Sequence, residues 1–192
     1  QLERFVFRSG LLMKPIFERA RNDPKRLVFV LSRYKFVSKM LDGKEDVAEI
    51  GCGDGFGARI VKQAVKNLLI TDYDPYFIER FQGISSDKWP ITAMVHDILD
   101  KPLERKFNAI YSLDVLEHIP TLNEDTFIKN IMLSLKDSGV LVLGMPSLES
   151  QSFASSKSKM GHINCKTGLE FKELMENYFD NVFLFSMNDE VV

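Results

Sequence analysis

Apolar residues in the first part of the chain recur at helical spacing. Between Lys25 and Leu41 they lie three or four positions apart, which predicts an amphipathic helix. Asp23-Pro24 before this segment and Asp42-Gly43 after it are typical helix start and stop signals. A shorter helix is predicted over Leu11–Ala20. The pattern therefore predicts a helical N-terminal extension, residues 1–44, that packs on the rest of the protein.

From Gly43 onward, short apolar runs alternate with helical segments. The predicted strands are Val47–Ile50, Leu68–Thr71, Ile91–Val95, Ala109–Leu113, Val140–Met145 and Val182–Phe185. The predicted helices are Gly57–Asn67, Pro75–Gln82, Asn123–Leu135 and Thr167–Tyr178. This alternation is typical of a doubly wound α/β fold, with a mostly parallel sheet covered by helices on both faces. We expect one such Rossmann-like domain over residues 45–192, in which Ser147–Lys159 is a long loop.

Glycines stand at alternate positions directly after the first predicted strand. The segment is Glu49-Ile-Gly51-Cys52-Gly53-Asp-Gly55-Phe-Gly57. Glycine is required where the backbone takes a positive φ or where a ligand lies against bare main chain. The helix that follows would point its free N–H groups at that ligand. The spacing also fits a loose dinucleotide fingerprint, with Asp72 as its acid, so a nicotinamide-dependent oxidoreductase stays open at this point.

The same segment resembles motif I of class I S-adenosylmethionine-dependent methyltransferases, whose pattern is acid-x-Gly-x-Gly-x-Gly. The resemblance is to the type 11 and type 23 branches and their small-molecule or saccharide subgroup. It implies that the backbone of Gly51, Cys52 and Gly53 passes under the methionyl part of the cofactor. It also implies that Glu49 anchors the loop and the cofactor's amino group. Cys52 is then a small residue that fits the loop.

Further stretches match this family in order and spacing. They are Asp72-Tyr73 after the second strand, Asp97-Ile98 after the third, and Leu113-Asp114-Val-Leu-Glu117-His118 after the fourth. The resemblance implies that Asp72, next to Tyr73, accepts hydrogen bonds from the ribose hydroxyls. It implies that Asp97 binds the adenine amino group, that Ile98 packs on the adenine ring, and that Leu113 opens the loop facing the transferable methyl.

An arginine upstream of motif I extends the resemblance. Arg33-Tyr34-x-Phe36 is similar to the helix before motif I in a subgroup found with polysaccharide biosynthesis genes. There Arg33 would meet the cofactor's carboxylate; an ordinary surface arginine is the alternative. The family's last, antiparallel strand would lie beyond Val182–Phe185 and would be truncated at Val192. An open sheet edge favours pairing with a second copy of the chain, as a homodimer.

The resemblance implies transfer of a methyl group to a small-molecule or saccharide-like acceptor, with O-methylation as the expected chemistry. If the acceptor is a hydroxyl, His118 or Asp114 is the candidate base. We expect no metal, because no further His/Asp cluster has a usable spacing from Asp114, Glu117 and His118. Asp114 is instead expected to cap a helix, with Glu117 completing a capping box. A degenerate cofactor-binding partner subunit is the second alternative.

Composition and charge limit the kinds of binding partner and the cellular setting that we expect for this protein. The net charge of −2 argues against a general nucleic-acid binder. The distribution is uneven, since residues 1–45 carry eleven Lys/Arg against five Asp/Glu. No apolar run is free of charges over the length of a bilayer, so membrane insertion is not expected. Two cysteines and the absence of a secretory signal pattern are typical of a cytoplasmic protein with reduced thiols.

Overall fold

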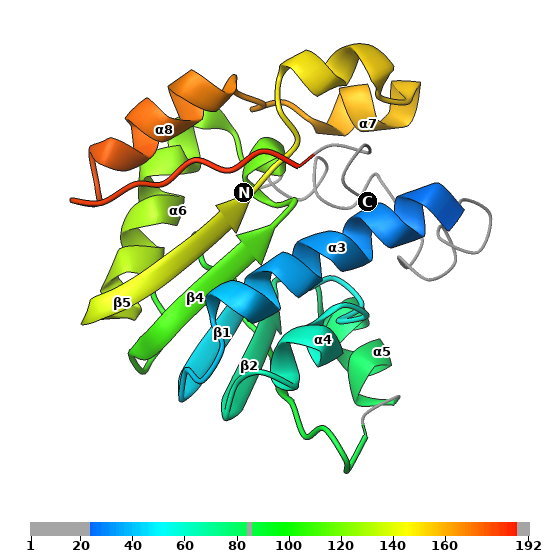
Figure 1. Ribbon diagram of the computed structural model, residues 1–192, viewed down its shortest axis with the longest axis vertical. Coiled ribbons are helices and arrows are strands. Elements are labelled where there is room, and N and C mark those ends of the chain that lie inside the picture. The colour runs from blue at the N-terminus through cyan, green and yellow to red at the C-terminus, as the bar shows by residue number, and fades with distance from the viewer. Residues whose placement is uncertain (1–23, 84–85, 188–192) are drawn as a thin grey trace.

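The computed structural model describes residues 24–83 and 86–187, and its centre is a five-stranded parallel sheet (Figure 1). The strands are β1 (Asp46–Ile50), β2 (Asn67–Asp72), β3 (Thr92–Val95), β4 (Phe107–Leu113) and β5 (Leu135–Gly144). Their order across the sheet is β3-β2-β1-β4-β5, and every neighbouring pair is parallel. The predicted fold class is confirmed.

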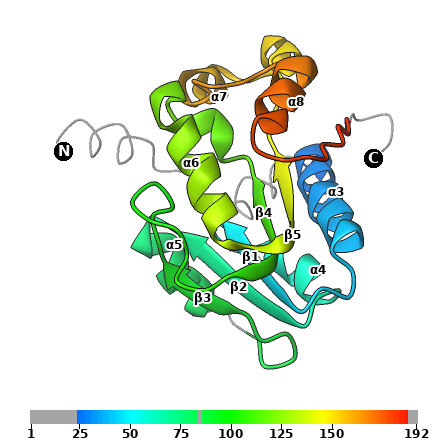
Figure 2. The ribbon, with the colours of Figure 1, turned by 90° about the vertical axis from the view of Figure 1, so that its left-hand side faces the viewer.

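Helices cover both faces of this sheet because its strands alternate their side chains between two apolar clusters. One face packs under α3 (Pro24–Met40), α4 (Ala58–Lys62) and α5 (Pro75–Gln82), and the other under α6 (Thr121–Leu133) and α8 (Gly168–Glu176). Along β2, for example, Ile70 belongs to the first cluster and Leu69 to the second. Figure 2 shows α3 and α6 on opposite sides of the strands.

The helix α3 is part of the main core. Its side chains at Val30, Tyr34, Val37 and Leu41 are buried against β1, β2 and β4. The predicted helix over Leu11–Ala20 lies outside the described residues. In the part of the chain that the structure describes, no helix is long and apolar enough to cross a membrane.

The chain reverses its direction across the sheet between β1 and β4. The first three strands are added outward from β1, and β4 then returns to pair with the other side of β1. In open parallel sheets, ligands bind outside the carboxyl ends of the strands at such a switch point. A ligand is therefore expected to contact the residues that follow β1, β2, β3 and β4.

Two predicted elements are wrong in extent. The helix expected over Gly57–Asn67 ends at Lys62, whose ammonium group donates to the carbonyls of Val65 and Lys66 (3.2 and 2.8 Å). The strand expected over Val140–Met145 begins earlier, at Leu135, and contains an irregularity where the pairing shifts from Phe107–Leu135 to Ala109–Val140. In both places the apolar pattern predicts that an element is present, whereas local hydrogen bonding determines the residue at which the helix ends or the strand begins.

The C-terminal part departs further from expectation. Val182–Phe185 is not a strand: the segment is irregular, with Val182 packed on the second cluster and Phe185 against the ring of Phe36. A short apolar run does not distinguish ladder pairing from side-chain packing. The predicted long loop holds a 3-10 turn, η2 (Glu149–Phe153), and a short helix, α7 (Ser156–Gly161). Figure 1 shows α7 beyond the carboxyl ends of β4 and β5.

Candidate active site

In the glycine loop after β1, Gly53 is uncovered, whereas the side chain of Val115 lies against Gly51. Both residues have positive φ, 53° and 75°. A Cβ added to Gly53 would meet nothing within 4 Å, whereas one on Gly51 would lie 2.3 Å from Cγ2 of Val115. The N–H groups of Gly51 and Cys52 donate to the carbonyl of Thr71 (2.8 and 2.9 Å). The loop is thus fixed to β2, and no atom covers Gly53 on the side where a Cβ would stand.

Glu49 lies beneath this loop as a fully buried carboxyl group. Its Oε1 accepts a hydrogen bond from the hydroxyl of Tyr34 (2.9 Å), and its Oε2 accepts one from Tyr111 (2.8 Å). Burial raises the pKa of Glu49 to about 7, against the lowering effect of the two tyrosines. The negative charges of Asp72 and Asp54 raise this pKa further. A positively charged ligand group near this carboxyl would favour its ionised form.

Asp72, the last residue of β2, joins the glycine loop to the start of α5. Its Oδ2 accepts a hydrogen bond from the N–H of Gly53 (2.9 Å), and its Oδ1 accepts one from the N–H of Asp74 (3.0 Å). Burial raises the pKa of Asp72. Each carboxylate oxygen can accept more than one hydrogen bond, so both oxygens retain capacity for a ligand. Tyr73 follows with an exposed side chain.

The end of β3 carries a second acid. Asp97 is half-buried, and its Oδ1 accepts a hydrogen bond from the N–H of Leu99 (3.0 Å). Ile98 is buried in the second apolar cluster. His96, at the same strand end, is buried, and its Nε2 lies 3.0 Å from the carbonyl oxygen of Lys101. The backbone after β3 is therefore held by short local contacts.

The end of β4 brings Arg33 and Asp114 together. Leu113 is half-buried, and Asp114 follows with a φ of 56°, an unusual conformation for a residue other than glycine. The carboxylate of Asp114 pairs with the guanidinium of Arg33, which also stacks 5.1 Å from the ring centroid of Phe29. The expected helix cap at Asp114 is wrong: η1 (Leu116–His118) follows Val115 without a side-chain cap, because the Asp114 carboxylate is committed to Arg33.

Glu117 is a second buried carboxyl group, and its surroundings differ from those of Glu49. It is 1% exposed, and within the described ranges neither of its oxygens accepts a hydrogen bond. Burial raises the pKa of Glu117, and the charge of Asp114 adds to this effect. The capping box expected from Glu117 is also wrong, since its side chain points into the interior.

His118 lies between Glu117 and the segment after α7. Its Nδ1 donates to the carbonyl oxygen of Gly161 (2.7 Å), and its Nε2 lies 3.8 Å from Oε1 of Glu117. The ring of His162 packs edge-on against it, with the ring centroids 5.2 Å apart. The sequence does not predict this grouping of Glu117, His118 and His162. A contact between two histidines so far apart in the chain has no local sequence signal.

Cys52 and Cys165 are both free thiols. Cys52 is buried in the glycine loop, and burial raises the pKa of its thiol. A buried thiol of raised pKa is inert, since the thiolate is the nucleophile. Cys52 therefore fits the structural place that the sequence analysis gave it.

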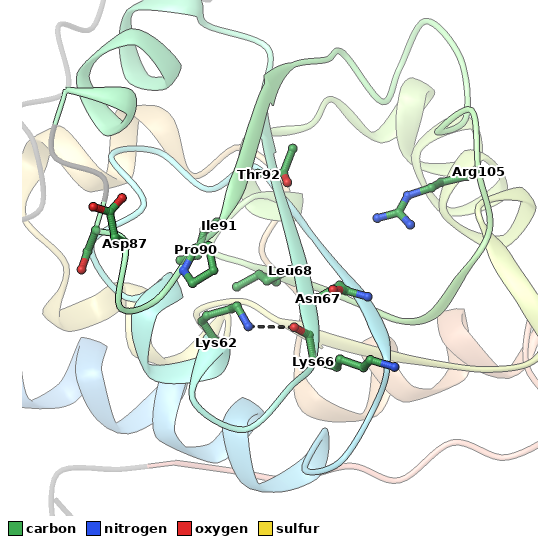
Figure 3. A pocket seen from close by; sticks show the side chains of 10 residues that line it. Lys62, Lys66, Asn67, Leu68, Asp87, Pro90, Ile91, Thr92 and Arg105 are labelled. Carbon is green, nitrogen blue, oxygen red and sulfur yellow. Dashed lines mark hydrogen bonds between the residues drawn. The ribbon is translucent and has the colours of Figure 1, made fainter.

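A pocket of about 560 Å³ lies at the opposite end of the strands, near the first residues of β2 and β3 (Figure 3). Its cationic side chains are Lys62, Lys66 and Arg105, a set that would suit an anion. All three have partners, however: Lys62 binds backbone carbonyls, Lys66 pairs with Glu45 (3.1 Å) and Arg105 with Asp46 (3.3 Å). None of the residues that line this pocket lies at the carboxyl ends of the strands.

The fold and the site together define a class of protein. The sheet is parallel and has a switch point, a glycine loop follows β1, and acids stand at the ends of β2 and β3. These features are typical of Rossmann-like cofactor-binding proteins. The family model described as "Methyltransferase domain" matches residues 19–179, which is most of the chain. The chain belongs to this methyltransferase family, and the family prediction is confirmed.

The relatives agree with this membership. A probable S-adenosylmethionine-dependent methyltransferase of Mycobacterium tuberculosis is 24% identical over 104 residues, which is 53% of this chain and 36% of that protein. The chain thus spans about a third of the length of this curated relative. The N-methyltransferase NodS of Bradyrhizobium japonicum has a TM-score of 0.63 at 20% identity, over 80% of this chain and 83% of NodS. The DhpI–SAM–HEP complex has a TM-score of 0.61 at 17% identity, over 84% and 85%.

Proposed function

We propose that this chain binds S-adenosylmethionine and transfers its methyl group to a small-molecule or saccharide-like acceptor. The observation that carries the proposal is the hydrogen bond between Asp72 and the N–H of Gly53. It fixes an acid of β2 beside the bare glycine backbone, so that a nucleoside and its charged tail can lie across both. The M. tuberculosis relative is described as dependent on the same cofactor, and the DhpI complex contains it.

Each part of the cofactor has a proposed partner at a strand end. The methionyl part lies over Gly51, Cys52 and Gly53, and Glu49 beneath them attracts the amino group. Asp72 accepts the ribose hydroxyls, with Tyr73 alongside. Asp97 binds the adenine amino group, Ile98 contacts the adenine ring, and Leu113 contacts the methyl-bearing end. These roles follow the order of the groups along the sheet edge.

Arg33 has two partners in this proposal. Its guanidinium already holds Asp114, and its five N–H donors allow it to bind the cofactor's carboxylate as well. Asp114 then serves to position Arg33, because its carboxylate is held in that ion pair. This favours His118 over Asp114 as the group that acts on the acceptor.

The proposed reaction is an in-line displacement. An acceptor oxygen forms the bond to the methyl carbon, the carbon–sulfur bond breaks, and its electrons neutralise the sulfonium. Alignment of donor and acceptor provides most of the rate enhancement in such a step. A hydroxyl acceptor also gives up a proton, and Nε2 of His118 is the group we place beside it, because Nδ1 donates to Gly161.

Three further features bear on the partners and the cellular setting. The outer edges of β3 and β5 carry ladder groups that no other strand of the described residues pairs, which supports a homodimer as the assembly to test. The two free thiols suit a reducing, cytoplasmic setting. The net charge of −2 favours a small acceptor over nucleic acid. Light scattering at several protein concentrations would measure the oligomeric state.

The direct test of the proposal is titration calorimetry with S-adenosylhomocysteine, the reaction product, and with NAD as the control ligand. We expect the first to bind and to raise the melting temperature by mass action, and NAD to do neither. Binding of NAD alone would overturn the proposal in favour of an oxidoreductase. A methyl-transfer assay on sugars and nucleotide sugars then distinguishes an enzyme from a binding subunit, which would bind the product without turnover.

A further inference from the structure

Three side chains that can bind a metal ion meet beside the proposed donor site. Glu117, His118 and His162 each present one ligand atom, and these atoms lie within 4.8 Å of one another. Val115, just before Glu117, is the residue whose side chain closes on Gly51 of the glycine loop. The cluster therefore lies next to the loop, on the side where the segment between β5 and α8 crosses the strand ends.

Both histidines are oriented as metal ligands usually are. Nδ1 of His118 donates to the carbonyl oxygen of Gly161 (2.7 Å), and Nδ1 of His162 lies 2.8 Å from Oε1 of Gln151. A metal-binding histidine generally donates one ring N–H to a carbonyl or carboxylate, which fixes the ring and leaves the lone pair of the other nitrogen for the ion. With Nδ1 as the donor in each ring, Nε2 carries that lone pair.

Glu117 supplies an independent indication of a bound cation. Both of its oxygens are buried without a hydrogen-bond partner among the described residues. An unsatisfied buried carboxyl group is costly, and a metal ion is one of the few ligands that compensates it. The backbone around it is firmly held, because its carbonyl oxygen accepts the N–H groups of Ile163 and Asn164 (2.8 and 3.0 Å). The backbone of Glu117 is thus well ordered, and yet its carboxyl group has no hydrogen-bond partner among the described residues.

We propose that Glu117, His118 and His162 bind a divalent transition-metal ion of the zinc type. Two imidazoles and one carboxylate form the protein half of open zinc sites, which keep a position for water or substrate. Ligand atoms about 2.0–2.1 Å from the ion lie roughly 3.3 Å apart in a tetrahedron. The distance of 3.8 Å between Nε2 of His118 and Oε1 of Glu117 is close to this value, and the ligand atom of His162 lies within 4.8 Å of both.

The ion also gives the proposed reaction a way to handle the acceptor's proton; this step rests on the proposed function. An ion held by these residues would make an acceptor hydroxyl at its open position more acidic, as zinc does for bound water. The proton would go to solvent, the oxygen would form the bond to the methyl carbon, and the electrons of the broken carbon–sulfur bond would remain on sulfur. His118 would then act on the acceptor by holding the ion, and not by taking the proton itself.

The test uses the tag-free chain, stripped with a chelator and titrated with Co²⁺ and Zn²⁺ as probes. We expect a single Co²⁺ per chain with the visible absorption of a four- or five-coordinate ion, displaced by Zn²⁺. The variants Glu117→Gln, His118→Gln and His162→Gln should each weaken binding by at least about tenfold, and Gln151→Ala by about tenfold through the orientation of His162. The matched controls His96→Gln, outside the cluster, and Cys165→Ser, a neighbouring thiol, should bind Co²⁺ as the parent chain does.

Two outcomes would overturn the metal site: no Co²⁺ binding at about 100 µM, or binding that the three ligand substitutions leave unchanged. Each variant is checked for folding by its melting temperature and for the donor site by its affinity for S-adenosylhomocysteine. Metal binding without product binding would leave this site in place and refute the proposed function. Product binding without metal binding would do the reverse.

Discussion

The proposed donor side and the proposed acceptor side of the site are built in different ways. On the donor side, Glu49 and Asp72 belong to the central strands themselves, and both are buried. On the acceptor side, His162 and the residues before it belong to the connection between β5 and α8. There Phe153 is 92% exposed and Met160 66% exposed, so neither side chain is held by packing.

The difference teaches where this fold is fixed and where it can vary. The donor groups cannot move without disturbing the sheet, whereas the acceptor segment is attached by a few hydrogen bonds. In the main ones, Nδ1 of His118 donates to the carbonyl oxygen of Gly161, and the N–H groups of Ile163 and Asn164 donate to the carbonyl oxygen of Glu117. Segments held by few buried contacts open at low free energy cost. Such a division, with fixed groups on the strands and a loosely held connection, would allow the acceptor to change while the methyl donor stays the same.

The largest effect is expected from Tyr34, on the donor side. Tyr34→Ala removes a buried ring that packs over Gly57 and edge-on to Tyr111, and it leaves Oε1 of Glu49 without its donor. We expect a loss of about 3–5 kcal/mol in the free energy of unfolding, measured with urea. Tyr76→Ala, at an exposed tyrosine, is the matched control and should cost far less. Equal losses would show that the donor side is not the rigid one.

A smaller effect is expected from the pH dependence of Glu49. Because the folded pKa of about 7 exceeds the ordinary 4.5, the native state binds the extra proton between these values. This proton stabilises the native state relative to the unfolded one. Its contribution to the free energy of unfolding is fully present below about pH 4.5 and is lost as the pH rises through about 7, a change of roughly 3 kcal/mol. Unfolding of the parent chain and of Glu49→Gln, measured between pH 4.5 and 8, isolates this contribution. Parallel pH profiles for the two chains would contradict it.

The next prediction concerns cofactor affinity and rests on the proposed function. Asp72→Ala removes a carboxylate placed to accept the ribose hydroxyls. The affinity for S-adenosylhomocysteine should fall by about 1.5–3 kcal/mol, the range for hydrogen bonds to a charged group. Calorimetry measures the change, and Asp137→Ala, at an exposed acid in the β5 irregularity, serves as the control. An unchanged affinity for the Asp72 variant would refute the ribose assignment.

The smallest effect on stability is expected on the acceptor side. Phe153→Ser changes a side chain that is almost wholly exposed, so the free energy of unfolding should stay within about 0.5 kcal/mol of the parent value. If this residue closes over the methyl group during turnover, as a lid, the Michaelis constant for the acceptor should rise instead. A stability loss above about 1 kcal/mol would mean that Phe153 is packed in solution, and the contrast between the two sides would weaken.

The sequence predicted the strands and the glycine loop well and the contacts around Asp114 and His118 poorly, for a physical reason. Strand periodicity and the glycine pattern are local signals, and they predicted the positions of all five strands and of the loop after β1, although β5 begins at Leu135 and not at Val140. The pairing of Arg33 with Asp114, and of His118 with His162, depends on how distant segments pack. No local pattern encodes such contacts. The same limit explains why Val182–Phe185, an apolar run of strand type, packs by side chains alone.

The two tyrosines on Glu49 also bear on how the chain acquires its fold during synthesis. One donor, Tyr34, lies 15 residues before Glu49, but the other, Tyr111, lies 62 residues after it. The carboxyl group therefore cannot be fully satisfied in the interior until β4 has been made and has paired with β1. A growing chain that stops short of β4 would keep this end of β1 hydrated. The contact between Tyr111 and Glu49 is a long-range one, and such contacts form slowly.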